Sequence, residues 1–515
     1  MTGEPARHSL HPGLAPLFRR LQEVNQTAYR LPYVLCNRVL SKIPDAGALL
    51  AAYTAEYPPA EPGRLQKAWT LVRYLVRNVV WFALHAAWTL AWMCSGQKYD
   101  TRRRSGIRLI DAYFLIGKIL DSRCFQDVYF PGLTEEMQRL DEDYIHCPRF
   151  YGAYNPIRFF RMFRILAKEG RPVLSEFQLL RFSDRLRMLL CIALYPLQLL
   201  KVLRLLGDSR EDKALRSALW RAMDDVVLGA YARGLFAKRL SHIFRDGACI
   251  SWYENQELEK CFIQGLRSGN QGIRIIGAQL YIWPDSILNF FPDPAERMLG
   301  LTPDKILANG PYYLQHTHGI DCAVGPSLRY RRLFEQQRPE QKGDSVLLLT
   351  SYFENETRLL LEWAGGLDLG ERLSVRFHPA VSVEAHRALL PRGASLSQGD
   401  LYDAVQSSML VAGRSTGALV EALALGVPCV TPVFDGRFVH QYLPETGRGV
   451  LWFEVRTRQE FSSLLDELRR PSSEQRRARD ETAKWFREHL FCEPTAERIC
   501  EAFELGARRS FSAGG

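Results

Sequence analysis

The sequence lacks the short motifs that mark many enzyme classes. It contains no HExxH, no aspartate-rich metal motif and no glycine-rich phosphate loop of the P-loop or GxGxxG kind. These absences exclude HExxH zinc hydrolases and P-loop nucleotidases. We therefore expect no metal or organic cofactor at its site.

Cysteine is present but has no pattern. The 11 cysteines are scattered singly between Cys36 and Cys500, without a CxxC pair, which is typical of reduced core thiols in a cytoplasmic protein. The opening segment MTGEPARHSLHPG lacks the basic segment and apolar run of a secretory signal. We expect a cytoplasmic protein.

The excess of positive charge is small. The sequence has 67 Lys and Arg residues against 57 Asp and Glu, a net charge of +10 over 515 residues. No RNP-type aromatic motif, zinc-finger spacing or basic coiled-coil region accompanies it, so nucleic acid is not an expected partner. Several arginines instead stand beside apolar segments, which favours a surface that faces anionic lipid.

Two segments have very few charged residues. No Asp, Glu, Lys or Arg occurs from Asn78 to Gln97, a predicted helix with three tryptophans and with arginines before it and at 102–104 after it. A second apolar helix is predicted from Leu186 to Leu206, kinked at Pro196. Tryptophans and flanking arginines are typical of a helix that lies in the headgroup region. We expect attachment in the membrane plane, with two buried core helices or a single bilayer span as open alternatives.

The chain is long enough for two or three domains. Hydrophobic residues make up 47% and charged residues 24%, which excludes general disorder. From Ala248 onward, short apolar strands alternate with helices, the pattern of parallel sheets covered on both faces. Strand-like runs before it include DVYFPGL and DYIHCP. We predict four regions: helical 1–104, an α/β acceptor domain 105–331 after which a polar linker follows, an α/β nucleotide-sugar domain 345–456, and a helical tail 457–515.

The strongest candidate site is the segment AGRSTGALVEALALGVPCVTP. A predicted strand ends at Gly413, then Ser415, Thr416 and Gly417 open a helix whose second turn carries Glu421. The unpaired N–H groups and partial positive charge of a helix start suit a phosphate, and the two hydroxyls add donors. Simple helix capping by Ser or Thr is the alternative.

A histidine follows another predicted strand. In LSVRFHPA, Pro379 stops the strand and leaves His378 at the carboxyl-terminal edge of the sheet. There its imidazole can donate to a phosphate or a nucleotide, although a single histidine after a strand is often structural. Because ligands of open α/β sheets bind at this edge, the two motifs point to one nucleotide site.

A third group of polar residues lies in the preceding domain. Glu254 follows the strand CISWY at a helix start, with Asn255 and Gln256 beside it. A carboxylate there can act as a general base, or it can simply favour the positive end of a helix. Gln279 and Asp285, at the end of the next strand, are expected to line the same cleft, and Asp285 is the second candidate base.

At these residues the sequence resembles the two-domain glycosyltransferase architecture known as GT-B, over about residues 248–490. The Ser415-Thr416-Gly417 helix start, Glu421 and Gly426-Val427-Pro428 look like that family's nucleotide-sugar helix and the strand after it. His378-Pro379 with Ser415-Thr416 is similar to the HP and Ser/Thr motifs of bacterial sialyltransferases, polysialyltransferases and capsule Kdo transferases. In those families the pair grips the cytidine monophosphate of a CMP-sugar. Glycerol-phosphate polymerases of teichoic-acid synthesis share similar motifs, and the acidic base motif of the sialyltransferases has no clear counterpart here. More narrowly, the segments IRLIDAYFLIG, YFPGL, WYENQELEK and GAQ resemble a group of O-antigen or capsule biosynthesis proteins.

The resemblance implies an α/β fold with a GT-B-like pair of Rossmann-type domains, to which the two apolar helices are added. It also implies a metal-independent glycosyltransferase at the cytoplasmic face of a bacterial inner membrane. The expected donor is a CMP-activated ulosonic acid and the expected acceptor a lipid-linked or growing surface glycan. A glycerol-phosphate-type polymer transferase, a nucleotide-sugar 2-epimerase and a non-catalytic scaffold for polysaccharide assembly are the alternatives.

Overall fold

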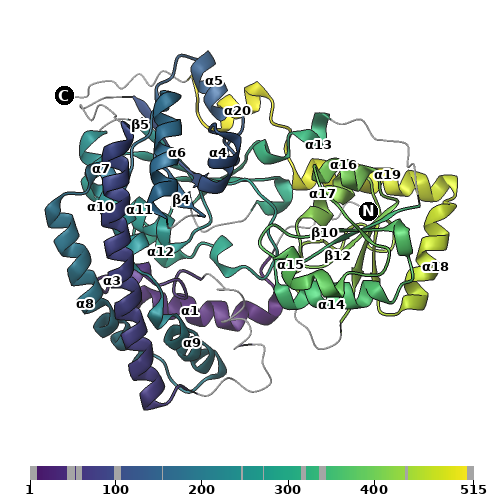
Figure 1. Ribbon diagram of the computed structural model, residues 1–515, viewed down its shortest axis with the longest axis horizontal. Helices are drawn as coiled ribbons and strands as arrows, with labels where there is room; N and C mark the ends of the chain where they lie inside the picture. Colours follow the sequence, from purple (N-terminus) through teal and green to yellow (C-terminus); the bar gives the residue numbers. More distant parts are fainter. Residues whose placement is uncertain are drawn as a thin grey trace.

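Two parallel six-stranded sheets form the framework of the protein (Figure 1). The computed structural model describes residues 9–42, 53, 61–97, 106–152, 155–244, 247–270, 272–314, 320–335, 344–434 and 439–506. The predicted fold class is thereby confirmed in its coarse form, an α/β chain with a pair of Rossmann-like sheets. The arginines at 102–104, the limit at residue 104 and most of the polar linker lie outside the described residues.

The first sheet has the order β3-β1-β5-β6-β7-β8, with all neighbours parallel. Its strands are β1 (Ile107–Asp111), β3 (Tyr144–His146), β5 (Gly247–Trp252), β6 (Arg274–Gln279), β7 (Lys305–Ala308) and β8 (Asp321–Val324). A separate parallel pair joins β2 (Tyr113–Leu115) to β4 (Arg149–Tyr151). The strand order reverses between β1 and β5, which makes their carboxyl ends the switch point where ligands of such sheets bind.

The second sheet has the order β11-β10-β9-β12-β13-β14, also parallel throughout. Its strands are β9 (Val346–Leu349), β10 (Leu373–Arg376), β11 (Ser395–Leu396), β12 (Leu410–Gly413), β13 (Cys429–Pro432) and β14 (Trp452–Val455). Counted from β9, this is the 3-2-1-4-5-6 order of dinucleotide-binding folds, and its switch point lies between β9 and β12. The all-apolar strands β9 and β12 are buried at every residue, as expected for a sheet covered on both faces.

Most helices surround the first sheet. They are α1 (Ala15–Ala28), α3 (Arg64–Ser95), α4 (Ile116–Ser122), α5 (Leu133–Arg139), α6 (Pro156–Lys168), α7 (Glu176–Leu179), α8 (Phe182–Leu203), α9 (Arg210–Arg221), α10 (Leu228–Ile243), α11 (Glu257–Gly269) and α12 (Pro294–Met298). The helices around the second sheet are α13 (Arg332–Glu335), α14 (Glu354–Gly365), α15 (Val383–His386), α16 (Leu401–Gln406), α17 (Ala418–Ala424), α18 (Arg458–Arg469) and α19 (Ser473–Leu490).

The last helix, α20 (Ala496–Ala502), returns to the first sheet. Figure 1 shows it beside α5, far from α18 and α19. Phe503 is fully buried there, with its ring edge-on to Phe130 at 6.0 Å between centroids. The helices after residue 457 therefore pack on the surroundings of both sheets, because α19 packs on α17 and α20 packs on α5.

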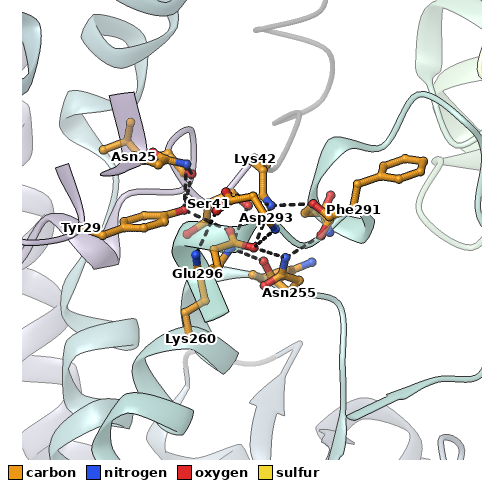
Figure 2. A network of polar contacts seen from close by, with 12 residues as sticks. Asn25, Tyr29, Ser41, Lys42, Asn255, Lys260, Phe291, Asp293 and Glu296 are labelled. Atoms are coloured by element: carbon orange, nitrogen blue, oxygen red, sulfur yellow. Dashed lines mark hydrogen bonds and ion pairs between the residues drawn. The ribbon is translucent and has the colours of Figure 1, made fainter. Parts of the chain in front are cut away.

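A buried charge network joins the N-terminal segment to the first sheet (Figure 2). The Lys42 and Lys260 ammonium groups lie 2.9 and 3.1 Å from the Glu296 carboxylate, and all three side chains are fully buried. Burial alone would raise the pKa of Glu296, but Lys260 and Lys42 outweigh it and hold that pKa at about 2. Asp293 lies 3.7 Å from Lys42 and completes two positive and two negative groups. The network fixes residues 25–42 against α11, α12 and the residues just before α12.

Several sequence expectations need correction. The apolar segment 78–97 belongs to a longer helix, α3, which begins at Arg64 and ends at Ser95. The second apolar helix begins at Phe182 and ends at Leu203, and it continues through Pro196. DVYFPGL is a loop that leads into α5, because its aromatic residues pack on the first sheet's core from outside the sheet. DYIHCP does form a strand, β3.

Candidate functional site

Segments that follow the carboxyl ends of strands in the two sheets meet each other. The backbone N–H of Asp285, after β6, donates to the carbonyl of Gln441 at 3.3 Å. Ser286 Oγ lies 2.7 Å from His440 Nδ1. A β-carbon placed on Gly417, at the start of α17, would lie 3.5 Å from the Ile282 side chain. This meeting point, called the sheet junction below, brings the ligand-binding edges of both sheets together.

The two nucleotide motifs lie on one edge of the second sheet. Arg376, Leu349 and Gly413 are register partners across β10, β9 and β12. His378 and Ser415 each stand two residues beyond this row, in the segments that follow β10 and β12. These two strands flank β9 and, with about 4.8 Å between neighbouring strands, lie roughly 10 Å apart.

His378 is held so that one ring nitrogen remains available. Its backbone N–H donates to Thr350 Oγ1 at 2.9 Å, and its Nδ1 accepts from the Ala380 N–H at 3.1 Å. Because burial lowers the pKa of His378, the neutral ring places its proton on Nε2. Tyr352 packs edge-on to the ring at 5.4 Å, and Pro379 opens the turn in which the Val381 N–H bonds to the His378 carbonyl. The side chain is thus a neutral donor at the sheet edge.

The Ser415 hydroxyl already has an anionic partner. It donates to Glu356 at 3.1 Å, and the buried Arg414 guanidinium reaches the same oxygen at 3.2 Å. The other Glu356 oxygen accepts from Ser351 Oγ at 2.7 Å. Glu356 therefore bridges the ends of β9 and β12 at the switch point. Ser415 has a backbone φ of 49°, a strained left-handed conformation of the kind that clusters at functional sites.

Thr416, Gly417 and Glu421 lie on or beside α17. Thr416 is buried, and Gly417 packs against both Ile282 and Tyr442. The Glu421 carboxylate accepts from Tyr402 Oη at 2.6 Å. Burial raises the pKa of Glu421, while Tyr402 and the positive charge of Arg329 act against that rise.

Arg329 connects the two halves of the sheet junction. It follows β8, and its guanidinium lies 5.5 Å from the ring centres of both Tyr129 and Trp252 in the first sheet's aromatic edge. The same side chain is exposed and acts electrostatically on Glu421 of α17. An exposed guanidinium held near aromatic rings is suited to bind a planar or tetrahedral anion.

Glu254 lies at the switch point of the first sheet, directly after β5. Its two carboxylate oxygens accept from Trp252 Nε1 at 2.8 Å and from Gln256 Nε2 at 2.6 Å. Gln256 also caps α11 with Glu259. The carboxylate is half-buried, oriented by two donors and beside the Tyr281 ring that stacks on Trp252, which is the geometry expected of a positioned base.

The remaining predicted residues divide into separate surroundings. Asn255, predicted to line a cleft, is fully buried instead, and its amide donates to Glu296 and to the Asn289 carbonyl within the charge network. The buried Gln279 Nε2 has no hydrogen-bond partner among the described residues. Asp285 lies beside His11 and Gln441, to which its backbone is hydrogen-bonded. Burial raises the pKa of Asp285 to about 6, while His11 acts in the opposite direction.

Buried charges behind Glu254 were not predicted from the sequence. Arg149 donates to Asp111 at 2.9 Å and contacts Glu259, and Arg233 donates to Asp111 at 2.7 Å. Burial raises the pKa of Glu259 to about 7, against the opposing effect of Arg149. These residues are far apart in the sequence, so no local pattern indicated that they would meet. A local pattern did exist for Glu356, because it stands in the first turn of a helix that follows a strand, as Glu257 does after β5.

Hollows elsewhere on the surface contain none of the predicted residues. One of about 740 Å³ is lined by Thr134, Glu142, Tyr144 and Arg171 among others, and one of about 310 Å³ by Arg267, Arg274 and Arg297 among others. Within the described ranges, no group of three or more His, Cys, Asp or Glu side chains is placed to hold a metal ion.

No protein-family model matches this sequence, and no curated protein is significantly similar to it. Among solved structures, MurG of Acinetobacter baumannii is similar at 13% identity and a TM-score of 0.41, over 78% of this chain and 100% of that one. The UDP-GlcNAc 2-epimerase of Neisseria meningitidis, bound to UDP-GlcNAc, reaches 10% and 0.44 over 77% and 99%. The spinosyn rhamnosyltransferase SpnG, complexed with spinosyn aglycone, reaches 13% and 0.38 over 77% and 100%. The two parallel six-stranded sheets of the chain itself define its fold.

Proposed function

We propose that the protein is a glycosyltransferase that binds a nucleotide-activated sugar at the sheet junction. The observation that carries the proposal is the alignment of His378 and Ser415 on either side of the second sheet's switch point. Glu254 takes the corresponding place in the first sheet. A donor bound to the second sheet and an acceptor bound to the first then meet between them.

The proposed chemistry uses the residues of the junction in different roles. His378 Nε2, the N-terminal N–H groups before α17 and the exposed Arg329 guanidinium stabilise the negative charge that develops on the departing nucleotide phosphate. Glu254 accepts the proton of the attacking acceptor hydroxyl. Glu356 holds Arg414 and Ser415 in place at the switch point. The Ser415 side chain therefore positions the loop, and the Ser415 backbone binds the phosphate.

The proposed donor is a CMP-activated ulosonic acid, and the proposed acceptor is a lipid-linked or growing bacterial surface glycan at the cytoplasmic face of the inner membrane. The support for CMP is the resemblance of His378-Pro379 and Ser415-Thr416 to the motifs of the CMP-sugar enzymes.

The test is the melting temperature of the full chain with CMP, UDP and GDP at equal concentration. A bound ligand adds RT ln(1 + [L]/Kd) to the free energy of unfolding, so the nucleotide that fits raises the melting temperature most. We expect CMP to do so. A larger shift with UDP or GDP contradicts the proposed donor, and the absence of any shift with all three contradicts the nucleotide site.

A further inference from the structure

The helix α3 has its polar side inside and its apolar side outside. Its buried residues include Thr70, Tyr74, Asn78 and Thr89. Asn78 donates to the Asp225 carbonyl and accepts from the Val227 N–H, so this polar side is satisfied by protein. Many of its outward residues are large and apolar, with exposed fractions of 89% for Leu65, 60% for Trp69, 57% for Val76 and 64% for Met93. Exposed arginines, among them Arg73 and Arg77, lie between them. A helix in contact with water has the opposite pattern.

The same surface continues onto α8. Tyr74 of α3 donates to the Ile192 carbonyl of α8 at 3.1 Å, and its ring stacks on Tyr195. Beyond this contact the outward side of α8 exposes Phe182, Leu190 and Leu197 by 75%, 52% and 55%. Figure 1 shows α3 and α8 along the edge of the molecule opposite the second sheet. The exposed apolar residues of these two helices are called the apolar face below. Continuous patches of this kind mark interaction sites.

The charges carried by α3, α8 and the neighbouring α6 are almost all positive. Helices α3, α6 and α8 together carry eleven Lys and Arg residues and one acidic residue, Asp184. Asp184 is buried and paired with Arg239 at 2.9 Å. Helix α6, which packs beside α3, adds the exposed Arg158, Arg161 and Arg164. Arg73 and Arg77 share Asp224, and most of the remaining cations face solvent. Charge complementarity therefore favours an anionic binding partner for the apolar face.

We infer that the apolar face docks on an anionic lipid bilayer, with α3 and α8 lying in the plane of the headgroups. A large apolar surface bordered by arginines and lysines, with an exposed tryptophan at position 69, fits the boundary between headgroups and acyl chains. Among the described helices, α8 alone is long and apolar enough to cross a membrane, which is weak evidence for a span. Inward residues from Met188 to Val202 are buried against the protein along its length, so a crossing requires this packing to be broken.

The experiment is flotation of the full chain with phosphatidylcholine vesicles that contain or lack phosphatidylglycerol. We expect the chain to float with the phosphatidylglycerol vesicles, less so at high salt, and hardly at all with phosphatidylcholine alone. The double variant Val76→Asp/Leu190→Asp places charge on the exposed sides of α3 and α8 and should weaken binding at least tenfold. The matched control is Met298→Asp, an exposed apolar residue of α12, which should bind as the parent does.

Two further measurements make the result decisive. The double variant should keep the parent's melting temperature without lipid and its response to nucleotide, so its defect is separated from misfolding and from the nucleotide site. The proposal is overturned if the parent stays soluble with both vesicles or if the double variant floats equally well. It is also overturned if the parent is a stable dimer that the double variant converts to a monomer, because the face then binds a second copy.

Discussion

At the scale of single residues, Glu254 differs from the other carboxylates of the junction in its surroundings. Glu421 and Glu356 each accept from side chains of the second sheet, whereas Glu254 is oriented by Trp252 and Gln256 of the first. Asp285 has a raised pKa but lies in another neighbourhood, beside His11. The geometry therefore favours Glu254 as the base.

We predict that Glu254→Gln lowers kcat by at least about a hundredfold and leaves nucleotide affinity nearly unchanged, because proton transfer contributes only in the transition state. Steady-state kinetics with donor and acceptor, together with nucleotide titration, measure the two effects separately. Normal turnover by the variant would show that the base lies elsewhere, and Asp285→Asn is then the next variant to test.

The buried network around Glu296 gives a second prediction at this scale. Removal of its negative charge by Glu296→Gln leaves the two buried lysines, Lys42 and Lys260, with Asp293 as the remaining carboxylate of the network. Removal of one partner from a buried ion pair typically costs about 3–5 kcal/mol. The melting temperature should fall strongly at neutral pH. The matched control is Glu384→Gln, which breaks an exposed pair with Arg387 and should cost less than about 1 kcal/mol.

The same network predicts how stability depends on pH. Glu296 has a folded pKa of about 2, below the ordinary 4.5, because Lys260 and Lys42 outweigh the effect of burial. Its contribution is therefore complete above the unfolded pKa and is lost as the pH falls from there toward about 2. Melting curves across this range should show a smaller pH dependence for Glu296→Gln than for the parent, and equal slopes would contradict the assignment.

At the scale of elements, the approach of α10 to α11 depends on two glycines. A β-carbon on Gly265 would collide with the backbone of Gly234 and lie 2.8 Å from the Ala237 side chain. Gly265→Ala should therefore force the helices apart, at a cost of about 1–3 kcal/mol.

The control for Gly265→Ala is Gly365→Ala at the end of α14, where a β-carbon has open space. Because alanine favours the helix, that change should be neutral or stabilising by up to about 1 kcal/mol. Thermal melting of both variants tests this prediction, and an unchanged melting temperature for Gly265→Ala would contradict the close contact between α10 and α11.

Local sequence patterns predicted the strands whose composition is enough to identify them. Short apolar runs that alternate with helices predicted β5, β6, β9, β10, β12 and β13, since buried parallel strands have that composition. The loop around Phe130 was mistaken for a strand because its aromatic residues serve the core without pairing. Helix α3 was predicted too short. Its first turns combine arginines with exposed apolar residues, and this is not the pattern of a helix whose outer side faces water.

The candidate site was predictable only in part. His378 and Ser415 were found because each follows a strand, and strand ends can be predicted locally. The register that aligns them, and the pairing of Glu356 with Ser415 and Arg414, depend on β9 lying between β10 and β12. Asn255 was misplaced because its positive φ turns the side chain into the network with Glu296.

At the scale of the whole molecule, the chain connects its two sheets more than once. Residues 325–335 lead from the first sheet to the second, and the segment after α19 returns, with the Ser327 N–H donating to the Cys492 carbonyl at 2.7 Å. Ile282 and Trp283 share a hydrophobic cluster with Val411 and Leu419. The apolar face lies at the opposite end from the second sheet (Figure 1), so we expect the proposed lipid binding and the proposed nucleotide binding to be separable.

The central claim is that the edge of the second sheet carrying His378 and Ser415 binds the nucleotide. The most direct measurement is calorimetric titration of CMP into the parent chain, His378→Ala, Ser415→Ala and the control Ser407→Ala, an exposed serine at the end of α16. We predict that each of the first two variants binds at least about tenfold more weakly, equal to ~1.4 kcal/mol, while Ser407→Ala binds as the parent does. Unchanged affinity in both His378→Ala and Ser415→Ala would contradict the account.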